Sequence, residues 1–99
     1  MIDIERTYWV QDGAERRDVV VRWRSVPDDH GVDACVAVEI TGVEEAWSTK
    51  IYGIDDVQGL QLALGIARVK LEKTRAFEED RLKWYGEDLG LPVTPTPSS

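Results

Sequence analysis

The stretch GIDDVQGLQLALGIARVKL, residues 53–71, decides the fold, because the segments before it need an apolar cover. Asp55 is placed to cap a helix, and Gln58, three residues on, is placed to reach back to the backbone N–H of the cap. Apolar residues then recur at intervals of three and four, which predicts one helical face made of Val57, Leu60, Ala63, Leu64, Ala67 and Leu71. We therefore predict a helix that packs on a sheet.

The same helix carries a second apolar stripe on nearly the opposite side, formed by Leu62, Ile66 and Val69. A helix that covers a sheet and is otherwise solvated does not need this stripe. We expect either the C-terminal segment of the chain or another molecule to cover it. Gly59 and Gly65 each cost a helix up to about 1 kcal/mol relative to alanine. Either a close approach of another backbone or a tolerated imperfection would explain them.

Four segments before this helix alternate between apolar and polar residues, as half-buried strands do. They are separated by the Asp12-Gly13 turn, a loop at residues 26–32 and a turn at residues 42–45. The residues predicted to face inward are Ile2, Ile4, Tyr8 and Val10 in residues 2–10, Val19, Val21 and Trp23 in residues 17–25, Ala34, Val36, Val38 and Ile40 in residues 34–40, and Trp47, Thr49 and Ile51 in residues 46–52. The fold class is thus α+β: a four-stranded antiparallel meander sheet with one long C-terminal helix packed on one face.

The end of the helix is predicted to lie between Thr74 and Arg81, or else at Gly86 after a continuation to Lys83. The segment LKWYGEDLGLP, residues 82–92, is too apolar for a free tail, and we expect it to fold back on the second stripe of the helix. Residues 92–99 have the composition of a disordered end. The organisation predicted is one α+β domain at residues 1–91 followed by a disordered tail at residues 92–99.

Composition excludes several classes of protein. A chain of 99 residues suits one domain, and a single cysteine cannot form an internal disulfide. The net charge of −7 argues against direct binding to nucleic acid or to an anionic membrane, since both require cations. The N-terminus lacks the pattern of a signal peptide, and no run approaches the roughly 20 apolar residues of a membrane span. We expect a cytoplasmic protein.

The segments IYGIDDVQGLQLALGIA and LKWYGEDLGLP together resemble the signature of a family of short bacterial proteins labelled only as a domain of unknown function. The motif residues are Gly53, Asp55 and Gln58 at the helix start, followed by Trp84, Gly86, Glu87, Leu89, Gly90 and Pro92. Gly59 departs from the larger residue expected at its position. The resemblance covers most of residues 4–92 and implies a small intracellular α+β domain, with no activity attached.

Catalytic and metal-binding patterns are sparse. His30 and Cys35 are the only residues of their types, and nothing in the sequence brings them together with a third orienting group. The loop acids Asp28, Asp29 and Asp33 beside His30 are better explained as turn residues than as metal ligands. We predict that the protein is not an enzyme and holds no metal or cofactor.

Two surfaces are candidates for binding another molecule. The outward sheet face combines aromatic and arginine side chains typical of protein interfaces: Trp9, Val20, Arg22, Arg24 and Tyr52. An acidic surface could be formed by Glu44, Glu45, Glu78, Glu79 and Asp80.

The sequence therefore favours a small acidic protein-binding module that inhibits or regulates a partner protein, as immunity proteins and antitoxins do. One alternative is a phage or mobile-element inhibitor whose carboxylates mimic nucleic acid. Another is a homo-oligomeric structural domain, for example a homodimer, which would use the same surfaces.

Overall fold

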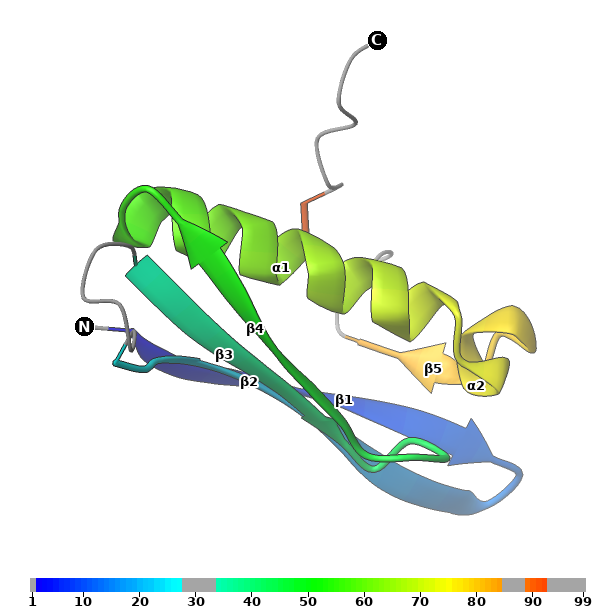
Figure 1. The fold of residues 1–99 in the computed structure, drawn as a ribbon. Coiled ribbons are helices and arrows are strands. Elements are labelled where there is room, and N and C mark those ends of the chain that lie inside the picture. Colours follow the sequence, from blue (N-terminus) through cyan, green and yellow to red (C-terminus); the bar gives the residue numbers. More distant parts are fainter. Residues whose placement is uncertain (1, 28–33, 85–88, 93–99) are drawn as a thin grey trace, which may run out of the picture.

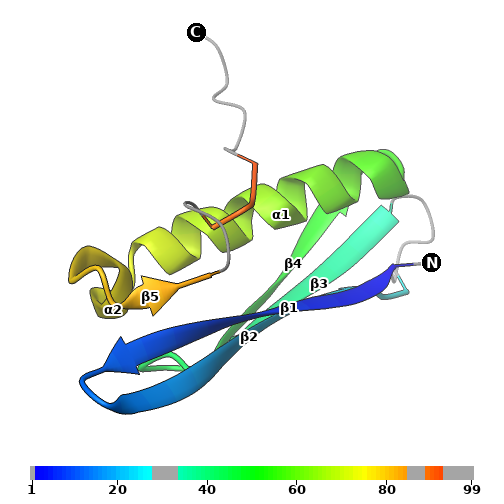
Figure 2. The same cartoon turned by 180° about the vertical axis from the view of Figure 1, so that it is seen from behind.

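The computed structural model describes residues 2–27, 34–84 and 89–92, and it has an α+β fold. A twisted antiparallel sheet is covered on one face by a long helix, as Figures 1 and 2 show from opposite sides. The strands are β1 (Asp3–Asp12), β2 (Glu15–Ser25), β3 (Ala34–Thr41), β4 (Trp47–Gly53) and β5 (Leu82–Lys83), in the spatial order β4-β3-β2-β1-β5. The predicted four-strand meander is present, but the prediction of four strands was wrong, because β5 pairs with the far side of β1.

The alternation of the sequence sets the two faces of the sheet. Val19 lies opposite Tyr8, and Val21 opposite Ile40, so their side chains point to the same, helix-covered face. Tyr8, Val19, Val21, Val36, Val38 and Ile40 are fully buried there. Ile4 was predicted to be buried with them but is 47% exposed. It lies near the start of β1, away from β5, which pairs with the other end of that strand at Trp9 and Val10.

Helix α1 (Asp56–Glu72) begins as the sequence predicts. Asp55 adopts an extended backbone, and its carboxylate accepts a hydrogen bond from the backbone N–H of Gln58 at 2.8 Å. The side chain of Gln58 accepts a bond of 2.7 Å from the N–H of Ile54, one residue before the cap, rather than from the N–H of the cap itself. Ala63, Ala67 and Leu71 are buried against the sheet.

Val57 was predicted to face the sheet but is 68% exposed. The reason is that the backbone at the start of the helix contacts the backbone at the end of β4. Gly53 and Gly59 are both buried, and a Cβ built on Gly53 would lie only 2.5 Å from the backbone nitrogen of Gly59. The first turn therefore approaches the sheet through glycine, and Val57 on this turn points to solvent. Close backbone approach therefore explains the glycine at position 53, whereas a Cβ at Gly59 would meet only a methyl group of Val36, at 3.3 Å.

The long helix ends at Glu72, earlier than predicted, because Thr74 breaks it. Thr74 has the extended backbone of an N-cap, and its hydroxyl donates to the carbonyl of Leu71 at 2.7 Å. The same hydroxyl accepts a bond from the N–H of Phe77, which starts the short helix α2 (Arg75–Glu78). Asp80, at φ 58°, then reverses the chain into β5.

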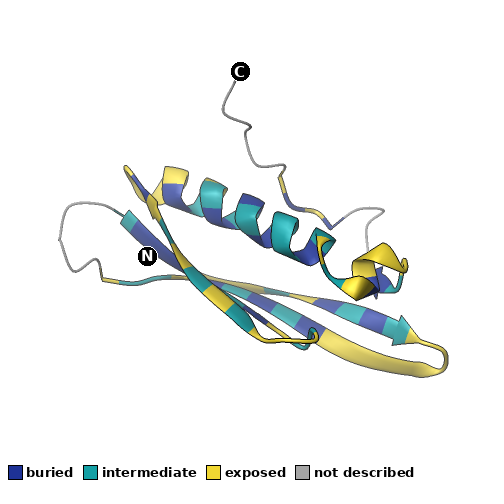
Figure 3. Ribbon diagram, turned by 45° about the vertical axis from the view of Figure 1, so that its right-hand side comes forward, coloured by how far each residue is buried: buried dark blue, intermediate teal, exposed yellow. Residues whose placement is uncertain are grey.

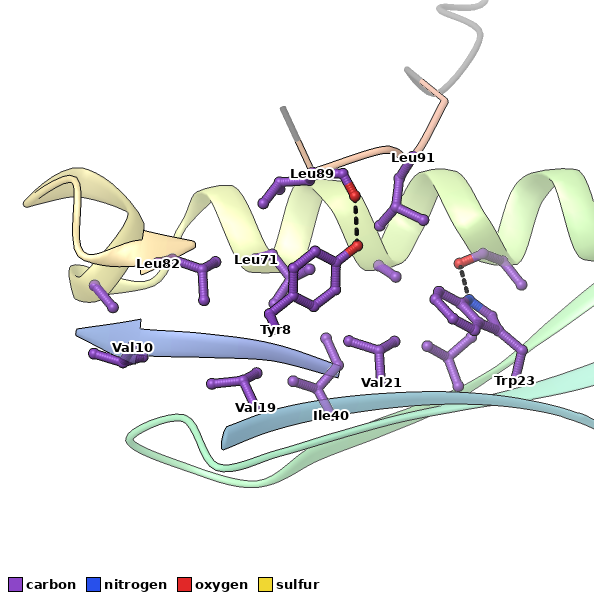
Figure 4. Packing of buried hydrophobic residues seen from close by; sticks show 14 of the residues in the cluster. Tyr8, Val10, Val19, Val21, Trp23, Ile40, Leu71, Leu82, Leu89 and Leu91 are labelled. Atoms are coloured by element: carbon purple, nitrogen blue, oxygen red, sulfur yellow. Dashed lines mark hydrogen bonds between the residues drawn. The ribbon is translucent and has the colours of Figure 1, made fainter. Parts of the chain in front are cut away.

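The C-terminal segment folds back, but its described contacts lie on a different side of α1 from the predicted one. The hydroxyl of Tyr8 donates to the carbonyl of Leu89 at 2.6 Å, and Arg68 of α1 donates to the carbonyl of Leu91. Leu89 and Leu91 are buried in the core cluster of Figure 4. At 100° per residue, Arg68 lies on the flank of α1 away from Leu62 and Ile66. Two segments therefore cover the inner face of the sheet: α1 packs over β3 and β4, and residues 89–91 contact β1.

Buried polar groups in this core find partners. The indole N–H of Trp23 donates to the carbonyl of Ala63 at 3.1 Å, which ties the C-terminal part of β2 to the middle of α1 (Figure 4). Because an unpaired buried donor costs about 1–3 kcal/mol, this bond fixes which part of the helix lies over β2. Among the described residues, no buried side-chain nitrogen or oxygen lacks a hydrogen-bond partner.

Candidate protein-binding surface

The outer face of the sheet carries all the residues predicted for partner binding, with Arg22 and Arg24 near its middle and Trp9 and Tyr52 at opposite corners. Val20, Arg22 and Arg24 project from the central strand β2, because all three alternate with the buried Val19, Val21 and Trp23. Trp9 projects from β1 and Tyr52 from β4 on the same face, as the strand registers require. No described helix covers this side of the sheet (Figures 1 and 2).

Ion pairs fix the guanidinium groups of this face. Arg22 contacts Asp3 at 3.1 Å, and Arg24 contacts Glu39 at 3.0 Å. Both pairs are exposed, so each contributes about 0–1 kcal/mol to stability. Their main consequence is orientation, since the paired guanidinium groups lie along the sheet and leave a flat surface. Arg16 similarly lies over the ring of Trp9 at 4.2 Å.

The outer face differs in charge from the rest of the chain. By strand register, its cations are Arg16, Arg22, Arg24, Lys50 and Lys83, and its acids are Asp3, Glu5, Asp18 and Glu39. Five cations against four acids leave this face close to neutral, whereas the whole chain has 12 cations and 19 acids. The negative charge of the protein therefore lies elsewhere, and the outer face is less acidic than the rest of the chain.

Small residues make the centre of this face shallow. Cys35 and Ala37 point outward from β3, yet they are only 4% and 9% exposed. Ala37 lies directly between Lys50 of β4 and Arg24 of β2, and Cys35 lies opposite Tyr52. Long side chains therefore surround short ones, which is a common form of a flat interface with aromatic and arginine anchors.

The acidic candidates lie at one end of the molecule but are mixed with cations. Glu44 and Glu45 precede β4, and Glu78, Glu79 and Asp80 are at or just after α2 (Figure 1). Arg75 contacts Glu44 at 3.9 Å and joins the two groups. Arg81 pairs with Glu79, and Lys83 pairs with Asp80 at 3.5 Å. The structure brings these acids together without forming a uniformly acidic surface.

A hollow of about 400 Å³ lies between the turn before β4 and the end of α1, lined by Val43, Glu44, Glu45, Lys70, Lys73 and Thr74. The sequence pattern did not indicate it, because its residues come from a turn and from one flank of the helix. Its side chains of opposite sign neutralise each other, and the arrangement contains neither a nucleophile beside a base nor a set of metal ligands. Within residues 2–27, 34–84 and 89–92, no group of metal-binding side chains is found.

His30 and the loop acids Asp28, Asp29 and Asp33 lie outside the described residues, as do Tyr85 to Asp88 and the tail from residue 93. Cys35 is buried. In the part of the chain that the structure describes, no helix is long and apolar enough to cross a membrane.

The fold and this surface define a small α+β domain with one covered and one open sheet face. The chain belongs to the family described as a domain of unknown function, DUF6968, whose model matches residues 4–93. This agrees with the resemblance to an unknown-function family found in the sequence. Neither the comparison with curated proteins nor that with solved structures gave a match.

Proposed function

We propose that this domain is a protein-binding module, which inhibits or regulates a partner through the outer face of its sheet. The observation that carries this proposal is the composition of that face. Trp9, Tyr52, Arg22 and Arg24 are the residue types most enriched at binding hot spots, and they share one uncovered, nearly neutral surface. Immunity proteins and antitoxins are the class of binder that this proposal has in view.

The mixed charges at the α2 end make mimicry of nucleic acid the weaker proposal. A mimic needs carboxylates spaced like phosphates and free of neighbouring cations, but Arg75, Arg81 and Lys83 each contact one of the candidate acids. Self-association remains an alternative use of the outer face. The test of the proposal therefore includes the oligomeric state.

The experiment is affinity capture from the source cells, with nuclease added to remove bridging nucleic acid. The bait variant carries Arg22→Glu and Arg24→Glu, which reverse the centre of the outer face. A matched control, Lys73→Glu and Arg75→Glu, makes the same charge change at the other side of the molecule. All three baits should have the same melting temperature, since the substituted residues are exposed or half-exposed.

A specific partner should be recovered by the wild type and by the control, and lost by the outer-face variant. Reversal of two hot-spot cations is expected to weaken binding by at least about 100-fold. Recovery of the same proteins with all three baits would refute the proposal, and a wild-type homodimer broken only by the outer-face variant would favour self-association.

A further inference from the structure

We infer that the open edge of β4 is a docking site for an extended segment of the partner, which adds to the sheet as a further strand with acidic residues opposite Lys50. This inference rests on the proposed function, that the domain binds another protein. It names a second part of the contact surface, at the border of the outer face.

The first step concerns the backbone of β4. Cys35 accepts a hydrogen bond from Val26, so the backbone groups of Cys35 point toward β2, and those of Val36 and Val38 point toward β4. Ile51 and Thr49, which lie opposite Val36 and Val38, therefore bond to β3. The N–H and C=O groups of Ser48 and Lys50 point the other way, toward the outside of the sheet. Because β4 ends the strand order, these groups form an edge that another strand can pair with.

The second step concerns the helix above this edge. Arg68 marks the flank of α1 that faces β1, through its bond to Leu91. The opposite flank carries Leu62 and Ile66, and Lys70 lies over the ring of Trp47 in β4 at 5.5 Å. This flank therefore overhangs the β4 edge. An added strand would lie about 4.8 Å beyond β4, with its inward side chains beside Leu62 and Ile66.

The partly buried state of Leu62 fits such an occupant. Leu62 does not belong to the buried core cluster, whereas Ile66 packs against it from the same flank. Figure 3 shows the alternation of partly buried and exposed residues along β4, which is that of a strand at the border of a sheet. Apolar side chains of an incoming strand would extend the core sideways by one row, between the helix flank and the sheet.

The third step concerns charge, which selects the occupant. Lys50 is the central residue of β4 and is exposed. Two β4 strands could pair antiparallel, with both outer faces on one side and the pairing centred on Lys50. In that arrangement Lys50 would lie opposite Lys50 of the second copy. Like charges directly opposite each other are unfavourable. An acidic residue in that position is favourable instead. The charge of Lys50 therefore favours, as the occupant, a strand of a different protein in which apolar and acidic residues alternate.

The test uses a blocked nonapeptide in which valine and glutamate alternate, added to the full ¹⁵N-labelled chain. The amides of Ser48 and Lys50 should shift and exchange more slowly with solvent, by about tenfold when the peptide is present at about ten times its Kd. The amides of Thr49 and Ile51, already bonded to β3, should change little in exchange. A matched peptide with lysine in place of glutamate should bind more weakly by about tenfold.

The Lys50→Glu variant should reverse the preference between the two peptides. Lys83→Glu, an equal change on the opposite edge of the same face, should not. Perturbation limited to the amides around Arg22 and Arg24 would overturn the edge site and leave the outer face as the protein-binding surface. Absence of any change at Ser48 and Lys50, or a dimer that protects them without peptide, would also overturn the inference.

Discussion

The backbone contact between the end of β4 and the first turn of α1 allows a sharp prediction. A Cβ at Gly53 would lie 2.5 Å from the nitrogen of Gly59 and 2.7 Å from its Cα. Both atoms are backbone, so the start of the helix would have to move away from the sheet by roughly half an ångström or more. Overpacking of this kind costs about 1–3 kcal/mol. We expect Gly53→Ala to lower the free energy of unfolding by about 2–3 kcal/mol.

Replacement of Gly59 by alanine, on the other side of the same contact, should behave differently. A Cβ at Gly59 would lie 3.3 Å from Cγ2 of Val36, and a side-chain methyl group can yield by a few tenths of an ångström. Alanine also stabilises a helix by about 1 kcal/mol relative to glycine. The two effects nearly cancel, so Gly59→Ala should stay within about 1 kcal/mol of the wild type.

Urea unfolding followed by tryptophan fluorescence measures the free energy of unfolding of both variants. For a domain of this size, Gly53→Ala should lower the melting temperature by roughly 10–20 °C. Gly13→Ala is the control, since Gly13 has φ +63° and a Cβ added there would meet no atom within 4 Å, so only backbone strain of about 1–2 kcal/mol applies. The reasoning fails if Gly53→Ala is no more destabilising than Gly13→Ala, or if Gly59→Ala costs as much as Gly53→Ala.

Three further changes test the C-terminal segment. Tyr8→Phe should cost about 1 kcal/mol in urea unfolding, because the buried hydroxyl loses its bond to Leu89, and no change would mean that this bond does not hold the segment. Trp84→Ala should cost about 2 kcal/mol in the same assay, because Trp84 is only half-buried. A loss of about 3–5 kcal/mol, as for a fully buried tryptophan, would contradict this. Deletion of residues 84–99 should cause self-association in light scattering, whereas truncation after Pro92 should not, and a monomeric, equally stable 1–83 chain would refute the packing role of the segment.

The central strands of the sheet could be predicted from the sequence because both of their neighbours are strands. Val19, Val21 and Trp23 of β2 and Val36, Val38 and Ile40 of β3 are buried as the alternation predicts. The same alternation failed for Ile4, and the helical period failed for Val57. A periodic pattern gives the side of a strand or helix, but burial depends on what lies above that position.

The helix end and β5 depend on contacts that a local pattern does not contain. Thr74 ends α1 by bonding the carbonyl of Leu71, whereas the sequence placed the helix end only within a range, between Thr74 and Arg81 or at Gly86. β5 has two residues, Leu82 and Lys83, and exists because β1 offers Val10 and Trp9 as partners. An element of two residues has no period of its own, so it could not be predicted.

The candidate surface was predictable as a face but not as a set of contacts. Period two places Trp9, Val20, Arg22, Arg24 and Tyr52 on one side, and the structure places them so. The pairing of Arg22 with Asp3 is diagonal, since Asp3 lies directly opposite Arg24. Which arginine takes which acid depends on side-chain reach, which strand register does not fix.

The position of the second apolar stripe of α1 is understood from the number of strands that one helix can cover. A helix is about 10 Å across and strands are about 4.8 Å apart, so one helix covers roughly two strands. Here α1 covers β3 and β4, while residues 89–91 contact β1, on the Arg68 side of the helix. No described segment is left for the other flank, where Leu62 and Ile66 overhang the last strand. An apolar flank beside an open sheet edge is what a domain needs if a strand from another protein is to complete both at once.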